Sequence, residues 1–416
     1  MGKILNDLTT PQKSILLTDK FYDSNSLFNL GGTLLIHQKV DFDILERAIN
    51  IFIQKNDGMR LGFELHDGKT YQYVQDYSYK KLPIYSISTE DELRSLENHF
   101  IHTKFNISKS FLYEFKLIKL KNGHGGFNIT LHHLISDAWS ISLLVSEIAN
   151  IYSRLLKNET ISEELNPSYI EYIESEQKYF NSEKFKKDAQ YWEGMFDKCP
   201  SCVSFSQKSS QNISQDAKRK IFPLENSKQI NEFCKKNNIS VFTFFMTVVA
   251  LYLHRTTGIK DVIIGSPILN RNGSKEKNMI GLFINTLPIK IEIPNSNISF
   301  SELVEHVSDK QFSMFRHHKY PYSKIVEYVR KQYKFSNNLY DTIVSYQNAR
   351  NNSQTSDVEY STNWDFNGST FNSLDIHLYD MDNTGILKLF YDYRLDRFEE
   401  DEIIDIHNRI LHIIDQ

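Results

Sequence analysis

The stretch Gly125-Gly126-Phe127-Asn128-Ile129-Thr130-Leu131-His132-His133-Leu134-Ile135-Ser136-Asp137-Ala138-Trp139-Ser140 begins with a hydrophobic period of two residues. Up to His133, apolar and polar residues alternate, which predicts a strand with one buried face. After Ser140, apolar residues recur at steps of three and four, which predicts a helix packed on a core. These positions are Ile141, Leu144, Ile148, Ile151 and Leu155. His133 is therefore predicted where a buried strand meets a helix, with Asp137 one helical turn further on.

An imidazole at the end of a buried strand is well placed for acid–base chemistry. The alternative is a core histidine whose ring is satisfied by hydrogen bonds within the protein. His132 and His133 are adjacent, so on a strand they point to opposite faces and cannot bind one metal ion together. We therefore predict no metal site at this pair.

Length and composition indicate the class of protein. The chain has 416 residues, of which 40% are hydrophobic and 24% charged, as in an ordinary globular protein. This length predicts two domains of roughly 200 residues each, because a single core rarely grows so large. The formal net charge of -4 at pH 7 argues against nucleic acid as the main partner, since phosphate binding requires a basic surface.

The N-terminus, Met-Gly-Lys-Ile-Leu-Asn-Asp, is too polar for a signal peptide, and Asn6 does not fit the myristoylation pattern. No window of the sequence has the length and apolar character of a membrane span. The protein is therefore predicted to be cytoplasmic and to have no membrane partner. Phosphate loops, Rossmann glycine patterns and zinc-protease motifs are not found in the sequence.

Three cysteines occur, two of them in a C-x-x-C spacing at Cys199 and Cys202, with Cys234 alone. A structural zinc site would need a second ligand pair, which the sequence does not supply. The spacing leaves open a redox dithiol or two spectator thiols in a polar connector.

Helical and strand patterns follow one another in two successive cycles along the chain. The first cycle predicts helices at 9–24, 42–56, 90–100 and after 140, strands at 28–36, 112–120 and 127–133, and a hairpin turn at 66–68. The second predicts helices at 168–196, 227–236, 241–254, 300–318, 322–332 and 398–414, strands at 220–224, 261–266, 341–347, 375–379 and 387–391, a connector at 199–217, and loops at 267–277 and 348–367. The stretch 279–293 is predicted to be strand-like after Gly281. Two mixed cycles indicate an α/β fold with one sheet per half. A site at His133 is then expected to face the second half, because clefts between domains often bind ligands.

The string His-His-Leu-Ile-Ser-Asp-Ala-Trp-Ser at 132–140 resembles the HHxxxDG signature of the condensation domains of nonribosomal peptide synthetases. The segment Met-Ile-Gly-Leu-Phe-Ile-Asn-Thr-Leu-Pro at 279–288 resembles the I-G-x-F-V-N-T segment of that family. Gly-Ser-Pro-Ile-Leu-Asn-Arg at 265–271 resembles its G-T-P-V-x-G-R and ends on Arg271. Weaker matches are His318-Lys319-Tyr320-Pro321-Tyr322, Tyr346-Gln347-Asn348, Gln12 and Arg60. The similarity thus extends along the whole chain, with the two strong segments in the family's order.

The resemblance implies an α/β fold of two acetyltransferase-like lobes, each with a mixed sheet and helices, in a V-shaped pseudo-dimer with a central tunnel. The N-terminal lobe would be residues 1–175 and the C-terminal lobe 176–416. A floor loop is expected at about 267–285 and a latch at about 348–371. Phosphopantetheine arms of donor and acceptor carrier proteins would enter the tunnel from opposite ends.

By the same resemblance, His133 is the catalytic residue and takes the proton of the attacking amine or positions that amine. Asp137 would form a structural ion pair with Arg271 rather than act as an acid. Supporting motif residues are His132, Asp137, Ala138, Trp139 and Ser140. Candidates for lining the tunnel or contacting substrate are Arg60, Gly281, Phe283, Asn285, Tyr346 and Gln347.

The family usually has glycine where this chain has Ala138. Alanine keeps the backbone N–H that would face the oxyanion and adds a methyl group, so a narrower tunnel is expected. The Ile-Ser-Asp-x-Trp-Ser wording at 135–140 looks more like the subtype that joins an L-configured donor to an L acceptor than the subtype with leucine before the aspartate.

The predicted activity is amide formation between a carrier-bound acyl or peptidyl thioester and a carrier-bound aminoacyl group, as in antibiotic biosynthesis. Alternatives with the same fold are epimerisation, ester formation and acyl transfer from coenzyme A. A non-catalytic recruiting domain is a further alternative, although such domains typically lose the second histidine. No tightly bound cofactor or metal is expected, since the carrier proteins supply the phosphopantetheine. The chain is expected to be monomeric, either excised from a larger synthetase or free-standing.

Overall fold

The computed structural model describes residues 3–21, 26–206, 208, 214–294, 298–348, 357–381 and 384–416. The chain divides into two compact units. Unit 1 comprises Met1–Asn181, Arg271–Phe283 and Asn351–Asn367, and unit 2 comprises Ser182–Asn270, Ile284–Arg350 and Gly368–Gln416. Residues of the expected floor loop and latch thus belong to both units, and residues 349–356 of the latch lie outside the described residues. The lobe boundary at 175 and the V-shaped arrangement stay predictions.

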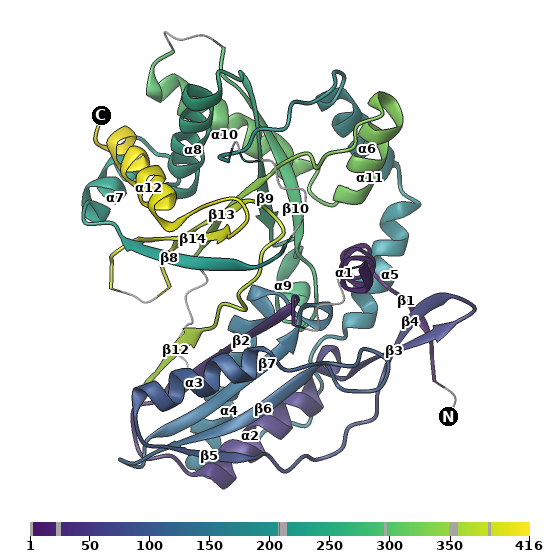
Figure 1. Cartoon of the computed structure of the whole chain (residues 1–416). Helices are drawn as coiled ribbons and strands as arrows, with labels where there is room; N and C mark the ends of the chain where they lie inside the picture. Colours follow the sequence, from purple (N-terminus) through teal and green to yellow (C-terminus); the bar gives the residue numbers. More distant parts are fainter. Residues whose placement is uncertain are drawn as a thin grey trace. The chain divides into compact units, whose positions relative to one another are not determined.

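The strands of unit 1 form two sheets within the described residues (Figure 1). They are β1 (Asn6–Asp7), β2 (Asn29–Ile36), β3 (Leu61–His66), β4 (Lys69–Val74), β5 (Ile84–Ile87), β6 (Tyr113–Leu120), β7 (Gly125–His132) and β12 (Tyr360–Trp364). One sheet has the order β12-β2-β7-β6-β5 and is antiparallel except between β5 and β6. The other has the order β1-β4-β3 and is antiparallel.

Helices cover both faces of the five-stranded sheet. The helical elements of unit 1 are α1 (Thr10–Phe21), α2 (Phe42–Lys55), the 3-10 turns η1 (Asp57–Arg60) and η2 (His133–Ile135), α3 (Glu90–Ile101), α4 (Ala138–Leu156), α5 (Tyr169–Phe180) and α9 (Gly273–Lys277). Apolar residues of α2 and α4 share one core with Leu34, Phe127 and Ile129 of the sheet. On the other face, Phe100 of α3 packs with Ile118, as the alternation of side chains along a strand requires.

Unit 2 has a mixed six-stranded sheet in the order β10-β9-β11-β13-β14-β8. Its strands are β8 (Ala217–Pro223), β9 (Asp261–Ile268), β10 (Asn285–Glu292), β11 (Thr342–Gln347), β13 (Leu374–Tyr379) and β14 (Lys388–Arg394). β11 runs parallel to β9 and β13, and the other neighbours are antiparallel. Its helices are α6 (Glu183–Met195), α7 (Ser227–Lys236), α8 (Val241–Thr257), α10 (Phe300–Arg316), α11 (Tyr322–Tyr333) and α12 (Glu400–Asp415).

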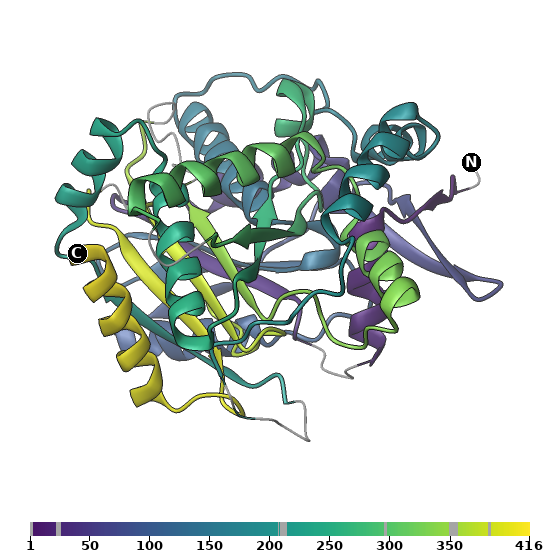
Figure 2. The ribbon, with the colours of Figure 1, turned by 90° about the horizontal axis from the view of Figure 1, so that it is seen from above.

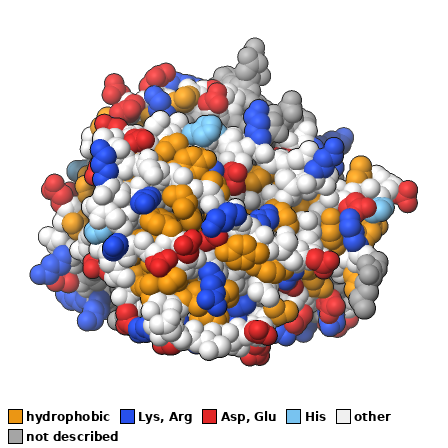
Figure 3. Space-filling model, turned by 90° about the horizontal axis from the view of Figure 1, so that it is seen from below, with side chains coloured by type: hydrophobic (Ala, Val, Ile, Leu, Met, Phe, Trp, Pro, Cys, Tyr) orange, Lys and Arg blue, Asp and Glu red, His pale blue; other side chains and the backbone are white. Residues whose placement is uncertain are grey.

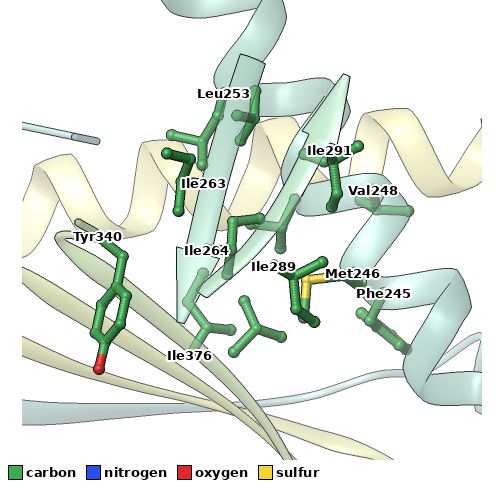
Figure 4. Packing of buried hydrophobic residues seen from close by; sticks show 14 of the residues in the cluster. Phe245, Met246, Val248, Leu253, Ile263, Ile264, Ile289, Ile291, Tyr340 and Ile376 are labelled. Atoms are coloured by element: carbon green, nitrogen blue, oxygen red, sulfur yellow. The ribbon is translucent and has the colours of Figure 1, made fainter. Parts of the chain in front are cut away.

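Helix α8 lies at the centre of the core of unit 2, beside α10 and α12 (Figure 2). Its side chains, among them Met246 and Val248, pack with Ile289 and Ile291 of β10 (Figure 4). No single described helix is long and apolar enough to cross a membrane. α7 and α8 meet that criterion only when joined, and the chain bends by 105° between them.

Most of the helices and strands that were predicted from a clear hydrophobic period are confirmed. β6 and β7 form where strands were predicted, they pair antiparallel, and α4 follows them. The turn at Asp67-Gly68 joins β3 to β4. Ser240 accepts a hydrogen bond from Thr243 N at 2.9 Å and caps α8, which ends at Gly258 with φ of 72°. A glycine adopts this left-handed conformation without steric cost.

Four predictions about the arrangement of elements are wrong. The described chain has three sheets rather than one per half, because β1, β4 and β3 form a separate sheet. The presumed loop at 348–367 contains β12, a polar strand that pairs with the edge of β2. The helix predicted at 168–196 breaks at Ser182, whose side chain caps α6. The loop at 267–277 contains the end of β9 and α9, and the strand predicted after Gly281 begins only at Asn285.

One face of the molecule agrees with the nearly balanced charge. On the face shown in Figure 3, basic and acidic side chains are interspersed among apolar ones. No broad basic area covers this face, and a basic area is what binding to a nucleic acid backbone requires.

Candidate active site

His133 lies at the turn that joins β7 to α4. β7 ends at His132, one residue earlier than predicted, and His133 begins the 3-10 turn η2. The backbone N–H of His133 donates to Phe28 O at 2.7 Å. Nε2 of Gln12 donates to Leu134 O at 3.1 Å, so α1 also holds this turn.

His132 has a structural role in the same turn. Its side chain is buried, and its Nδ1 accepts a hydrogen bond from Leu134 N at 3.0 Å. A nitrogen that accepts carries no proton, so the ring proton of neutral His132 is on Nε2, which lies 3.9 Å from Asp19 Oδ1. His132 therefore fixes the backbone conformation that orients its neighbour.

His133 is half-buried, and its Nδ1 has no hydrogen-bond partner within the described part of the chain. Burial lowers the pKa of His133 below its usual value near 6.5, and the nearby Asp137 carboxylate acts in the opposite direction without offsetting this. The imidazole is thus neutral at pH 7. A neutral imidazole can accept a proton or a hydrogen bond from an amine.

Asp137 is the N-cap of α4, and both of its carboxylate oxygens have partners. Oδ1 accepts from Ser140 N at 2.9 Å and from Arg271 Nη2 at 2.9 Å. Oδ2 accepts from Phe283 N at 3.0 Å. The Asp137 and Arg271 side chains are 2% and 0% exposed. Both oxygens of this buried carboxylate are therefore engaged in hydrogen bonds within the protein, which gives Asp137 a structural role.

Arg271 connects the segment Arg271–Phe283 to the start of α4. Its Nη1 donates to Glu276 O at 2.7 Å and to Met279 O at 2.6 Å, and its Nη2 donates to Ser140 Oγ at 2.7 Å. The guanidinium also lies 3.8 Å from the ring centre of Phe283. This planar group with several fixed donors satisfies the carbonyls and the carboxylate together, which a lysine could not do.

Gly281 allows this segment to approach α4 and α5 closely. Gly281 N donates to Ser140 Oγ at 3.0 Å, and Ser140 Oγ donates to Gly281 O at 2.8 Å. The Tyr169 ring lies against the glycine, and its hydroxyl donates to Leu282 O at 2.7 Å. Tyr169 was not predicted from the sequence, and no spacing signal marks it, because its partner is 113 residues away.

We predict that Gly281→Ala lowers the free energy of unfolding by about 1–3 kcal/mol. An added Cβ would lie 2.2 Å from Tyr169 Cδ2, and the hydroxyl bond to Leu282 O holds that ring in place. Urea denaturation measures the change. Gly194→Ala on α6 is the control. Its free energy of unfolding is expected to rise by about 0.5–1 kcal/mol, because no atom lies within 4 Å of the added Cβ. A Gly281 variant as stable as the wild type would contradict the prediction.

Ala138 and Trp139 form the first turn of α4. Ala138 is exposed, and Trp139 Nε1 donates to Lys277 O at 2.9 Å. Trp139 thus adds a further connection between α4 and the Arg271–Phe283 segment. The narrowing effect of the Ala138 methyl group on a substrate tunnel stays a prediction.

The remaining candidates make other contacts than those of this cluster. Arg60 donates to the backbone carbonyls of Ile53, Gln54 and Gln75, which gives it a local structural role. Asn285 belongs to unit 2, where its amide donates to His318 O and Tyr320 O at 2.9 Å each. Tyr346 and Gln347, also in unit 2, end β11, and Tyr346 donates to Asp380 Oδ2 at 3.2 Å. Their predicted contacts with substrate stay predictions.

Cys199 is exposed, Cys202 is half-buried and Cys234 is buried. Burial raises the pKa of Cys202 to about 11 and that of Cys234 to about 11, which disfavours the nucleophilic thiolate. Among the described residues, no group of three or more histidine, cysteine or acidic side chains is arranged to hold a metal ion.

Glu176 of α5 supports α1, the helix that carries Gln12. Its two carboxylate oxygens each lie 3.1 Å from Thr10 N, at the N-terminus of α1. Burial raises the pKa of Glu176 to about 7 although the bond to Thr10 and the charge of Lys13 lower it. The folded protein therefore holds this proton more tightly than the unfolded chain does, where the pKa is about 4.3.

From this difference we predict that stability falls as the pH rises from about 4.5 to about 7, since the unfolded chain loses the proton first. Glu176→Gln, which cannot ionise, should reduce this decline. Urea denaturation of both proteins from about pH 5 to about pH 8 measures it. Glu174→Gln, at an exposed position on the same helix, should keep the wild-type slope. An unchanged slope in the Glu176 variant would contradict the prediction.

Comparison with known proteins identifies the family. The family described as "Condensation domain" matches residues 6–416 of the chain. Surfactin synthase subunit 1 of Bacillus subtilis is 32% identical over 98% of this chain, and a plipastatin synthase of the same organism is 27% identical over 100%. The chain spans only 12% and 16% of the length of these two relatives.

Solved structures show the same fold. The first condensation domain of the CDA synthetase superposes with a TM-score of 0.85 at 18% identity, covering 99% of this chain and 95% of that one. A starter condensation domain of rhizomide synthetase in complex with C8-CoA gives 0.86 at 18% identity, covering 98% and 93%. With the family match over nearly all residues, the chain belongs to the condensation domains of nonribosomal peptide synthetases, acyltransferases that form amide bonds.

Proposed function

We propose that this chain joins an L-configured acyl or peptidyl donor to an L-aminoacyl acceptor, each carried as a thioester on a carrier protein. The observation that supports this proposal best is the state of His133. Its ring is half-buried and neutral, at the junction of β7 and α4. Asp137, the nearest charged group of the motif, is bound by Ser140, Arg271 and Phe283 and leaves His133 as the group for proton transfer.

The reaction needs little from the protein beyond alignment and one proton acceptor. The acceptor amine attacks the donor thioester carbonyl, a C–N bond forms, and the C–S bond breaks to release the carrier thiol. His133 takes the proton that the amine loses and can return it to the thiolate. Alignment of two bound substrates contributes about 7–11 kcal/mol to the barrier reduction, and a general base adds roughly 10²–10⁴-fold in rate.

One feature supports the proposed L configuration of the donor, and another supports the proposed carrier-protein partners. The residues Ile135-Ser136-Asp137 resemble the subtype that takes an L donor, since the other subtype has leucine before the aspartate. Condensation domains work with carrier-bound substrates, so donor and acceptor carrier proteins are the proposed partners of this chain. Phosphopantetheine would come with these carriers and not as a bound cofactor.

The test is mass spectrometry of the products formed from two loaded carrier proteins. The acceptor carrier holds an L-aminoacyl group, and the donor carrier holds the L or the D form of one amino acid in parallel reactions. The expected result is a dipeptidyl thioester on the acceptor carrier from the L donor and much less from the D donor. His133→Ala is expected to lose this product.

Each alternative predicts a different outcome. Preferred use of the D donor would contradict the proposed stereochemistry. Exchange of the α-proton with deuterated solvent, without a dipeptide, would indicate epimerisation. Product formed only when an acyl-CoA replaces the donor carrier would indicate a starter activity, as the C8-CoA bound to the rhizomide synthetase domain suggests for that protein. Binding of carriers without any reaction would indicate a recruiting domain.

A further inference from the structure

The six-stranded sheet of unit 2 has a polar cluster on the face that does not pack on α8. Val344, Ile376 and Tyr391 lie in the hydrophobic core. Because successive side chains of a strand point to opposite faces, Ser345, His377 and Asp392 lie on the other face. Ser345 and His377 are half-buried, and Asp392 is buried.

The strand register brings these three side chains together. Ser345 of β11 and His377 of β13 are direct partners. His377 is paired with Phe390 of β14, so Asp392 is its diagonal neighbour. Ser345 Oγ lies 2.6 Å from His377 Nδ1, and His377 Nε2 lies 3.1 Å from Asp392 Oδ2. The chain therefore places a hydroxyl, an imidazole and a carboxylate in one hydrogen-bonded row.

The hydrogen bonds determine which ring nitrogen carries the proton. A carboxylate only accepts, so Nε2 of His377 must donate to Asp392. Nδ1 of the neutral ring is then unprotonated and accepts from the Ser345 hydroxyl. This is the arrangement in which an imidazole removes the proton of a serine nucleophile, with the carboxylate stabilising the imidazolium that forms.

Arg219 of β8 keeps the carboxylate in its charged form. It donates to both oxygens of Asp392, at 2.6 and 2.7 Å. Although burial alone would raise it, the bonds from Arg219 and His377 lower the pKa of Asp392 to about 2. Asp392 is thus an anion at every pH at which the protein would work.

We propose that Ser345, His377 and Asp392 form a second acyl-transfer site, in which Ser345 attacks esters or thioesters with a small apolar acyl group. Two aromatic rings favour an apolar acyl group at this position. Phe390 is the cross-strand partner of His377, and Tyr379 stacks on Phe390 with ring centres 4.9 Å apart. This site uses no residue of the His133 motif.

The reaction proceeds in two steps. Ser345 Oγ forms a bond to the acyl carbon while His377 Nδ1 takes its proton, and the C–S or C–O bond to the leaving group breaks. The leaving thiol or alcohol takes that proton from His377. Water then attacks the acyl-serine, His377 removes a proton from the water and returns one to Ser345 Oγ, and a carboxylic acid is released.

The test treats the whole 416-residue chain with p-nitrophenyl acetate and, separately, with a fluorophosphonate probe. Released nitrophenol gives the rate, and peptide mass spectrometry locates the phosphonate adduct. The expected result is an adduct on Ser345 and hydrolysis that falls by about 10²-fold or more in Ser345→Ala and His377→Gln. Ser146→Ala is the matched control, because within the described part of the chain the Ser146 hydroxyl donates to the Leu143 carbonyl of its own helix. This variant should behave as the wild type.

Two results would overturn the proposal. One is the absence of an adduct on Ser345 in the folded wild type. The other is an adduct or a hydrolysis rate that is unchanged in His377→Gln, which would show that the imidazole does not activate the serine. Thermal unfolding of each variant excludes misfolding as the cause of a loss. If His377→Gln does not fold, Ser345→Ala with adduct mapping decides the question by itself.

Discussion

Asp137→Ala is expected to lower the free energy of unfolding of the region around α4 by about 3–5 kcal/mol. The change leaves the Arg271 guanidinium buried, with 0% of its side chain exposed, and removes its only carboxylate partner among the described contacts. It also leaves the N–H groups of Ser140 and Phe283 without their acceptors. An unpaired buried charge and two unsatisfied donors each cost free energy.

Two measurements test this expectation. Urea denaturation gives the loss of stability, and hydrogen exchange of the peptide around Phe283 gives the local effect. Glu159→Ala is the control, because the Arg154–Glu159 pair has the same 2.9 Å separation with both side chains more than 40% exposed. Such exposed pairs contribute about 0–1 kcal/mol. Equal losses in the two variants would mean that burial of the Asp137–Arg271 pair has no energetic consequence.

His133→Ala is expected to reduce the rate of peptide bond formation by roughly 10²–10⁴-fold if His133 is the general base. The acceptor amine would then lose its proton to solvent instead of to a fixed group. Quenched-flow measurement of dipeptide on the acceptor carrier gives the rate. His102→Ala is the control, since His102 is exposed and bonds the backbone carbonyl of Asn98. It should keep the wild-type rate.

The pH dependence distinguishes a base from a positioning group. Protonation of His133 abolishes its basic function, and burial lowers its pKa. The wild-type rate should therefore persist below pH 6.5, where an exposed histidine is already protonated, and then fall. The variant should lack this fall. A variant rate within about tenfold of the wild type, with the same pH profile, would reduce His133 to a structural role.

The sequence by itself determined the elements that depend on neighbouring residues. β7, α4 and the hairpin at Asp67-Gly68 follow from periods of two and 3.6 residues and from turn chemistry, which act over a few positions. The condensation domain family was recognised from motifs that are continuous in the chain. The place of His133 at the end of a strand came from the same local pattern.

Only the tertiary structure decided most of the hydrogen bonds between distant residues. The family resemblance implied the pair of Asp137 and Arg271, which are 134 residues apart. No spacing rule connects Tyr169 with Leu282, which are 113 residues apart. The polar strand β12 was missed because an edge strand needs few apolar residues. Side chains from distant strands meet only when the sheet register is set, and register depends on the packing of the whole core rather than on any local pattern. The row formed by Ser345, His377 and Asp392 could not be predicted for the same reason.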